Sequence, residues 1–291
     1  MKKSNFQALF LIILCLVIFC GYLILDRIRT DDTPPQIHVD SGNRELTVES
    51  GREELLRGIT ATDDVDGDVT DSLVVEDVRI LNSAEGIVTV SVAAFDRSGN
   101  VSKASYDVCY TDYHSPRFHL SRPLVFTQNS GADILNFVSA EDMVDGDISK
   151  HIRATSFSDA SVNSQGVHDI QFRVTNSMGD TSELVIPVEV HTAGIYEAGL
   201  ELTDYLVYLD HGDSFNAEDY LKSFTLNRTT TALNQGLPQG YSLQLSGSVN
   251  TQTSGVYTIG YLVTYTVSNG AAGSAARSYT GYSKLIVVVE G

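Results

Sequence analysis

The chain has 291 residues, of which 42% are hydrophobic, so it is long enough for two or three domains and apolar enough to build their cores. It carries 37 acidic residues against 19 basic ones, a formal net charge of −18, and no stretch gathers Lys and Arg into a basic stripe. Because nucleic-acid binding requires Lys and Arg to neutralise phosphates, this charge argues against a nucleic-acid partner.

The first predicted element is a membrane-spanning helix over residues 6–25. Gln7 is its only clearly polar residue, and at about 1.5 Å per residue the helix would span about 30 Å, the thickness of a bilayer core. A cleaved signal peptide would have a shorter apolar core and a small-x-small cleavage site, which this stretch lacks. We therefore expect a cytoplasmic tail at 1–5, an anchor at 6–25 that contacts the membrane, and a linker at 26–33.

The rest of the chain repeats itself. The segment TPPQIHV at 33–39 matches HSPRFHL at 114–120, and the acidic stretch DDVDGD at 63–68 matches DMVDGD at 142–147. Both matches have offsets close to 80 residues, which indicates tandem modules. A third, more distant copy follows, so the predicted domains are 34–111, 112–191 and 192–291.

Each module ends in a predicted antiparallel hairpin. The segments 85–100, 165–180 and 254–270 alternate apolar and polar residues, as Val88 and Val90 do with Thr89, and this period of two is typical of a half-buried strand. A turn rich in Gly, Asn or Asp and a second β-rich run follow each of them. No segment after residue 30 has a convincing helical period. We therefore predict an all-β fold of three tandem immunoglobulin-like β-sandwiches after one N-terminal transmembrane helix.

The order of these segments carries a family resemblance. A first strand led by Pro, the stretch GITATDDVDGDVTDSLVV at 58–75, a Gly-led strand ending in Asp-x-x-Gly-Asn and a closing strand resemble the bacterial Ig-like module first recognised in a pesticidal crystal protein. The resemblance covers 34–111 and 113–191. It is weak in the third module, where TLNRTTTALNQ at 225–235 replaces the carboxylates. It implies modules outside the cell membrane, with the N-terminus inside, and a role as spacer or adhesive module.

The two acidic stretches allow two interpretations. Three carboxylates close in sequence suit a hard cation such as Ca²⁺, which takes about six to eight oxygen ligands. A tight turn is the alternative, because Asp side chains accept hydrogen bonds from backbone N–H groups two residues on and glycine tolerates positive φ. The candidate metal ligands are Asp63, Asp66, Asp68, Asp142, Asp145 and Asp147.

Catalysis fits these residues poorly. Acid–base work by paired carboxylates needs a cleft with shifted pKa values, whereas these Asp residues lie in a repeated turn that the third module lacks. The sequence also has no Cys/His ligand cluster, nucleophile elbow or phosphate loop. We expect no enzyme activity, no catalytic residue and no cofactor apart from a possible Ca²⁺.

The third module holds ten of the fourteen Tyr residues, and Tyr-rich surfaces often bind ligands. The strand alignment places Tyr257, Tyr261 and Tyr265 on the core face. The remaining candidates for a ligand-binding face are Tyr205, Tyr208, Tyr279 and Tyr282.

These observations predict a single-pass protein of the cell membrane whose C-terminal region is extracellular. Its modules would act as a spacer, as an adhesin or as a component of a cell-envelope assembly. The first alternative is a glycan- or cell-wall-binding protein that uses the third domain. The second alternative is an accessory subunit of a membrane partner. The expected partners are the membrane and a cell-surface protein or glycan.

Overall fold

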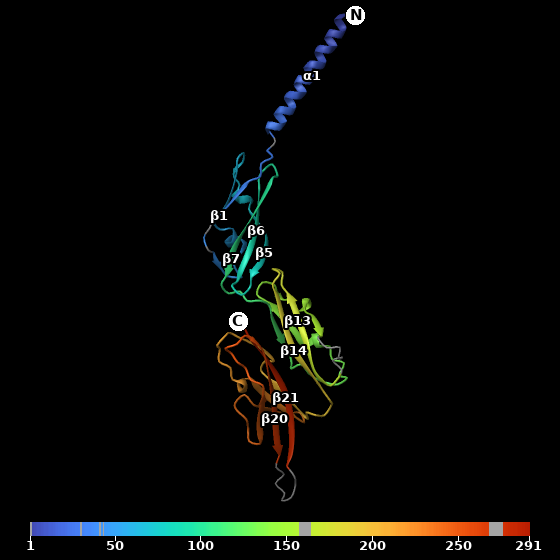
Figure 1. Cartoon of the computed structure of the whole chain (residues 1–291), viewed down its shortest axis with the longest axis vertical. Helices are drawn as coiled ribbons and strands as arrows, with labels where there is room; N and C mark the ends of the chain where they lie inside the picture. The colour runs from blue at the N-terminus through green and yellow to red at the C-terminus, as the bar shows by residue number, and fades with distance from the viewer. Residues whose placement is uncertain (1, 30, 41, 43, 157–163, 268–275) are drawn as a thin grey trace. The chain divides into compact units, whose positions relative to one another are not determined.

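A computed structural model describes residues 2–29, 31–40, 42, 44–156, 164–267 and 276–291. The chain forms two compact units, Met1–Tyr113 and His114–Gly291 (Figure 1). The described residues after the first helix are mainly strands, which confirms the all-β prediction.

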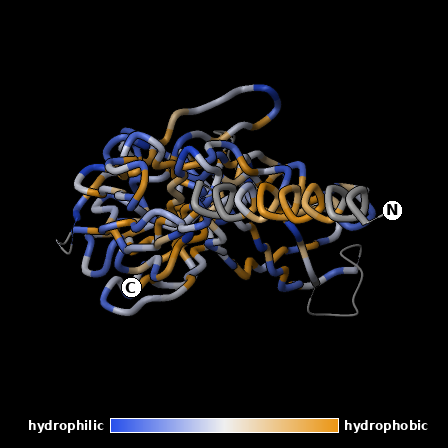
Figure 2. Tube along the Cα trace, turned by 90° about the horizontal axis from the view of Figure 1, so that it is seen from above, coloured by the Kyte–Doolittle hydropathy of each residue, from blue (hydrophilic) through white to orange (hydrophobic). Residues whose placement is uncertain are grey.

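The first unit begins with α1 (Lys2–Arg29), whose hydrophobic middle part is visible in Figure 2. The side chains of residues 2–8 and 24–29 lie outside the described part of the chain. Among the residues that are described, no helix has the length and apolar character needed to cross a membrane. The prediction of a helix is confirmed, but the prediction of a membrane anchor at 6–25 is not supported.

Two sheets build the rest of the first unit. A three-stranded sheet has the order β1-β3-β4, and a four-stranded sheet has the order β2-β7-β6-β5. The bounds are β1 Gln36–Val39, β2 Glu45–Leu46, β3 Ile59–Asp63, β4 Gly67–Asp68, β5 Val74–Asn82, β6 Ile87–Phe95 and β7 Val101–Tyr110, with short helices α2 Arg52–Leu56 and η1 Thr70–Ser72.

The predicted alternation determines which face of β6 is core. Val88, Val90 and Val92 are completely buried, while Thr89 and Ser91 between them are half-buried. β6 pairs with β7 along its whole length, from Ile87 opposite Cys109 to Phe95 opposite Val101. The hairpin expected from the sequence is therefore confirmed.

Residues 114–191 of the second unit repeat this arrangement strand for strand. Their sheets have the orders β8-β10-β11 and β9-β14-β13-β12. The bounds are β8 Arg117–Leu120, β9 Val125–Thr127, β10 Val138–Asp142, β11 Gly146–Asp147, β12 Arg153–Ser156, β13 Gly166–Thr175 and β14 Thr181–His191, with η2 Ile134–Phe137 and η3 Ser149–His151. The sequence repeat of the first two modules thus corresponds to a repeated topology.

Residues 192–291 depart from that pattern, because their strands join into one seven-stranded sheet of order β18-β17-β15-β21-β20-β19, with β16 also paired to β21. β15 and β16 both run parallel to β21, beside successive parts of it. The bounds are β15 Ala198–Leu202, β16 Leu206–Leu209, β17 Leu221–Leu226, β18 Thr229–Ala232, β19 Tyr241–Ser246, β20 Gly255–Val267 and β21 Arg277–Val289, with η4 Ala217–Tyr220.

The two halves of the second unit share apolar packing. Leu206 on β16 and Ile286 on β21 belong to the hydrophobic cluster that fills residues 114–191, together with Phe118, Phe172 and Ile186. Their neighbours Leu285 and Val287 on β21 belong instead to the cluster of residues 192–291. Because successive residues of a strand point to opposite faces, β21 supplies side chains to both clusters.

Candidate functional site

The first acidic stretch forms a tight hairpin between β3 and β4. Asp63 is opposite Gly67 in the ladder, and its Oδ1 accepts hydrogen bonds from the backbone N–H groups of Val65 (2.9 Å) and Asp66 (2.8 Å). Gly67 has φ +77°, a conformation that glycine adopts readily. The turn predicted from the sequence is therefore present.

The second acidic stretch has the same geometry. Asp142 Oδ1 accepts from the N–H groups of Val144 and Asp145, each at 2.9 Å, and Gly146 has φ +68°. A buried Asp that organises its own turn thus recurs in both modules, since Asp63 is 8% and Asp142 is 2% exposed.

Asp68 and Asp147 instead accept hydrogen bonds from the residues that follow each acidic stretch. Asp68 Oδ1 accepts from the Thr70 N–H at 3.0 Å, and Asp147 Oδ1 accepts from the Ser149 N–H at 2.9 Å. Hydrogen bonds from Thr70 and Ser149 hold the pKa values of these carboxyl groups below their usual range. Both Asp residues are exposed. They therefore organise the starts of η1 and η3.

The two turns differ in what reaches the second oxygen of the buried Asp. Asn176 donates its Nδ2 hydrogen to Asp142 Oδ2 at 3.0 Å. Asp63 Oδ2 is buried without a hydrogen-bond partner among the described residues, and so is Asp31 Oδ2. Asp31, Asp63 and Asp66 each place a carboxylate oxygen within 4.8 Å of the others.

Of the six predicted metal ligands, the structure thus places Asp63 and Asp66 in a three-carboxylate group. It adds Asp31, which the sequence analysis assigned to a linker. In the second turn, Asp145 accepts hydrogen bonds from the N–H (2.6 Å) and hydroxyl (2.7 Å) of Ser177.

Two of the four predicted ligand-binding tyrosines lie where the halves of the second unit meet. The Tyr208 hydroxyl accepts from the Phe118 N–H at 2.8 Å, the Arg117 guanidinium lies 5.0 Å from its ring centre, and burial raises the pKa of Tyr208 to about 12. The Tyr282 hydroxyl donates to Glu189 at 3.1 Å, and burial raises its pKa as well.

The other two tyrosines pack within residues 192–291. Tyr205 and Tyr279 are half-buried against the hydrophobic cluster of that half. The Arg277 guanidinium lies 4.8 Å from the centre of the Tyr279 ring. Tyr261, predicted to be core, is completely buried and donates to the Ala217 carbonyl at 2.9 Å.

A buried lysine completes the contact between the two halves. Lys284 on β21 is 1% exposed, lies with Nζ 3.3 Å from Glu189 Oε1 and also donates to the Pro187 carbonyl. Burial lowers the Lys284 pKa, an effect that Glu189 opposes. Arg117 forms a second ion pair across the contact, with Glu290. We call the residues that make these contacts the polar joint. They are Arg117, Glu189, Tyr208, Tyr282, Lys284 and Glu290.

Lys284 was not among the predicted site residues, although a lysine in the apolar run YSKLIVVVE at 282–290 is a usable signal. Long-chain cations are rarely fully buried unless they are paired. A lysine inside a hydrophobic strand therefore indicates a buried acceptor elsewhere in the fold.

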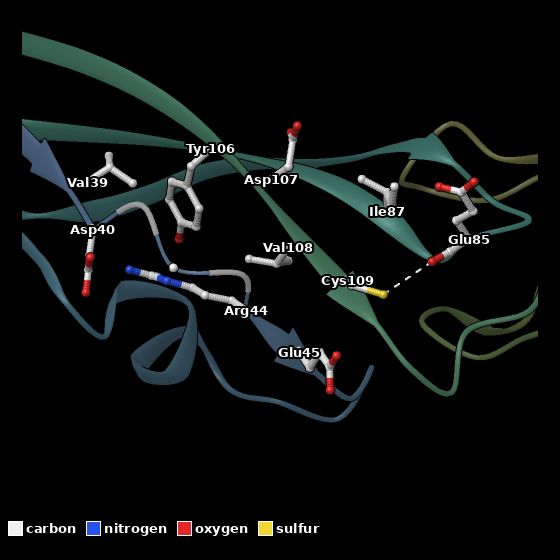
Figure 3. A pocket seen from close by; sticks show the side chains of 11 residues that line it. Val39, Asp40, Arg44, Glu45, Glu85, Ile87, Tyr106, Asp107, Val108 and Cys109 are labelled. Atoms are coloured by element: carbon white, nitrogen blue, oxygen red, sulfur yellow. Dashed lines mark hydrogen bonds between the residues drawn. The ribbon is translucent and has the colours of Figure 1, made fainter.

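The first unit also has an open groove of about 540 Å³ beside β2 and β7 (Figure 3). The Arg44 guanidinium lies 5.0 Å from the centre of the Tyr106 ring and donates to the Leu55 carbonyl at 3.0 Å. The remaining charged side chains of the lining are acidic, namely Asp40, Glu45, Glu85 and Asp107. Arg44 thus covers one face of the Tyr106 ring.

No family model matches the chain. A stretch of 95 residues is 32% identical to an uncharacterized 81.3 kDa protein of Acholeplasma phage L2, and it covers 33% of this chain but only 13% of that protein. The more specific resemblance, to the module of the pesticidal crystal protein, stays a prediction.

Solved structures with similar folds come from two kinds of protein. The CBM51-2 and INT domains of Clostridium perfringens ZmpB are 20% identical over 52% of this chain and 26% of that chain, with a TM-score of 0.22. Mouse cadherin-23 EC22-24 is 10% identical over 89% of this chain and 99% of that chain, with a TM-score of 0.21. At these TM-scores the likeness carries no argument about function.

Proposed function

We propose that the chain is an extracellular repeat protein that acts as a spacer or adhesive module, in which residues 114–291 form one stiff segment. The polar joint carries this proposal. Tyr208 and Tyr282 were predicted to bind a ligand. In the structure, the Tyr208 hydroxyl accepts a hydrogen bond from Phe118 and the Tyr282 hydroxyl donates one to Glu189, each across the contact between the two halves of the unit.

Stiffness follows from the kind of contact. The joint combines a shared hydrophobic cluster, to which Leu206 and Ile286 contribute, with a lysine that is 1% exposed. Rotation of one half against the other would bring the Lys284 ammonium away from Glu189 while it is still buried. An unpaired buried charge costs several kcal/mol, so alternative orientations are disfavoured.

An extracellular position is supported by the resemblance of the first two modules to an Ig-like module that recurs on bacterial surface proteins. Tandem repeats with stiff connections transmit tension and hold a terminal contact at a distance. The net charge of −18 favours solubility and disfavours contact with anionic polymers.

Pulling the full chain by its two ends in optical tweezers tests the proposal. If residues 114–291 are one mechanical segment, they extend in a single step of about 60 nm, at about 3.6 Å per residue. Residues 31–113 of the first unit extend separately by about 30 nm. Three steps of about 30 nm each would show that the halves of the second unit yield independently, and the stiff spacer would be wrong.

The glycan-binding alternative has its own readout. Retention of the full chain on cell-wall polysaccharide, lost in Tyr279→Ala, would favour a ligand face on residues 192–291. Tyr279 is the suitable residue because it lies outside the polar joint, packed beneath Arg277. Tyr282→Ala is unsuitable, since it removes the hydrogen bond to Glu189.

A further inference from the structure

Three carboxylates of the first module lie close enough together to bind one cation. Asp31 lies on the segment before β1, Asp63 ends β3, and Asp66 lies in the turn that follows. Asp63 is 8% exposed, and its Oδ2 is buried without a hydrogen-bond donor among the described residues, while one oxygen of each of the three carboxylates lies within 4.8 Å of the others. Asp31 Oδ2 is buried and without a donor in the same way. Carboxylates this close together, with buried oxygens that lack donors, are unfavourable unless positive charge lies between them.

The second module is an internal comparison for this arrangement. At the position of Asn176, which donates to Asp142, the first module has Asp96, and a carboxylate cannot donate. Asp96 instead accepts from the N–H (2.8 Å) and Nδ2 (2.7 Å) of Asn100. The first module therefore has Asp96 where the second has Asn176, and its buried Asp63 lacks the donor that Asn176 provides to Asp142.

The linker carboxylate differs between the modules as well. The repeat offset of 81 places Asp112 at the position of Asp31. Asp112 Oδ1 accepts from the Val48 N–H at 2.9 Å. Asp31 is instead directed to the acidic turn, and its segment is fastened there because Asn100 Nδ2 donates to the carbonyls of Asp31 (2.9 Å) and Thr33 (3.3 Å).

We propose that Asp31, Asp63 and Asp66 bind one divalent cation of the calcium type, in the first module only. Carboxylate oxygens are the ligands that such hard cations prefer, and water completes a shell of about six to eight oxygens. Arg97 contacts both oxygens of Asp66: its backbone N–H donates to Oδ2 at 2.7 Å, and its Nη1 lies 3.6 Å from Oδ1 on a side chain that is 86% exposed and therefore a weak competitor for a cation. Binding joins the segment before β1 to the β3–β4 turn and fixes the direction in which the chain enters the module.

The test uses the full chain after treatment with a chelator, titrated with CaCl₂ in a calorimeter. We expect one Ca²⁺ per chain with a Kd of about 10⁻⁴–10⁻³ M, the range of extracellular calcium modules, and weaker binding of MgCl₂. Asp31→Asn replaces one of the three carboxylates with a neutral amide. This variant should weaken Ca²⁺ binding at least about tenfold, since one of the three anionic ligands is lost, and should raise the melting midpoint in chelator.

Asp112→Asn is the matched control, and it should leave Ca²⁺ binding unchanged because its Oδ1 still accepts from Val48. Asp66→Asn is a second test variant, in case Asp31→Asn does not fold. The proposal is overturned if Ca²⁺ produces no saturable heat with the chelator-treated chain. It is equally overturned if Asp31→Asn and Asp66→Asn bind Ca²⁺ as tightly as the parent, which would indicate diffuse association with the acidic surface.

Discussion

Removal of the Glu189 carboxylate is the most direct perturbation of the polar joint. Lys284 is 1% exposed, and Glu189→Ala leaves its ammonium group buried with a hydrogen bond to the Pro187 carbonyl but without its carboxylate partner. Stranding one member of a buried ion pair costs about 3–5 kcal/mol. The Tyr282 hydroxyl also loses its acceptor, which adds about 1 kcal/mol. Because the Glu189 side chain is 27% exposed, water reaches the site, and we expect about 3 kcal/mol in total.

The assay is urea unfolding of the full chain, followed by far-ultraviolet circular dichroism. The same strand offers a matched control in Glu183, which lies 3.4 Å from Arg173 with side chains 45% and 61% exposed. An exposed pair of this kind contributes about 0–1 kcal/mol, so Glu183→Ala should shift the midpoint little. If Glu189→Ala costs no more than Glu183→Ala, Lys284 does not depend on Glu189 and the argument for a stiff joint fails.

Three further predictions follow from contacts in the second unit. Ile286→Ala should destabilise that unit by about 2–5 kcal/mol in urea unfolding, whereas Val256→Ala, at a side chain 45% exposed, should change it by less than about 0.5 kcal/mol. Because burial lowers the Lys284 pKa, the unfolded chain binds this proton more readily, so stability should rise with pH between the lowered pKa of Lys284 and the ordinary lysine value of about 10.4; Lys284→Met should abolish the rise, and an unchanged slope would contradict the reasoning. Asn176→Asp removes the donor to Asp142 and should cost about 1–3 kcal/mol in chelator, with part of the loss recovered by Ca²⁺; equal stability to the parent would refute the role of this hydrogen bond.

Structural features that depend on residues close together in the sequence could be predicted. The alternation at Val88, Val90 and Val92 identifies the core face of β6 because a strand has a period of two. The acidic turns could be recognised because an Asp side chain reaches backbone N–H groups only two or three residues away, as Asp63 does. The helix α2 (Arg52–Leu56) was missed, since five residues are too few to show a helical period.

Features that depend on long-range contacts could not be predicted. Asp31 precedes Asp63 by 32 positions, and its place in the group depends on hydrogen bonds from Asn100 near the end of the module. Tyr208 and Tyr282 were predicted to bind a ligand, and their hydrogen bonds to Phe118 and Glu189 come from strands far away in the sequence. Periodicity identifies the second face of a strand, but it does not say which part of the chain covers that face.

The position of β21 has a consequence for synthesis. The cluster that fills residues 114–191 includes Ile286, yet β14 ends at His191 and β21 begins at Arg277. At about 5–20 residues per second, a ribosome needs about 5–20 s to make the intervening chain. During that interval the nascent segment exposes the apolar surface that Leu206 and Ile286 later cover. We therefore expect the second unit to complete its folding only once β21 has emerged, and to depend on chaperone protection until then.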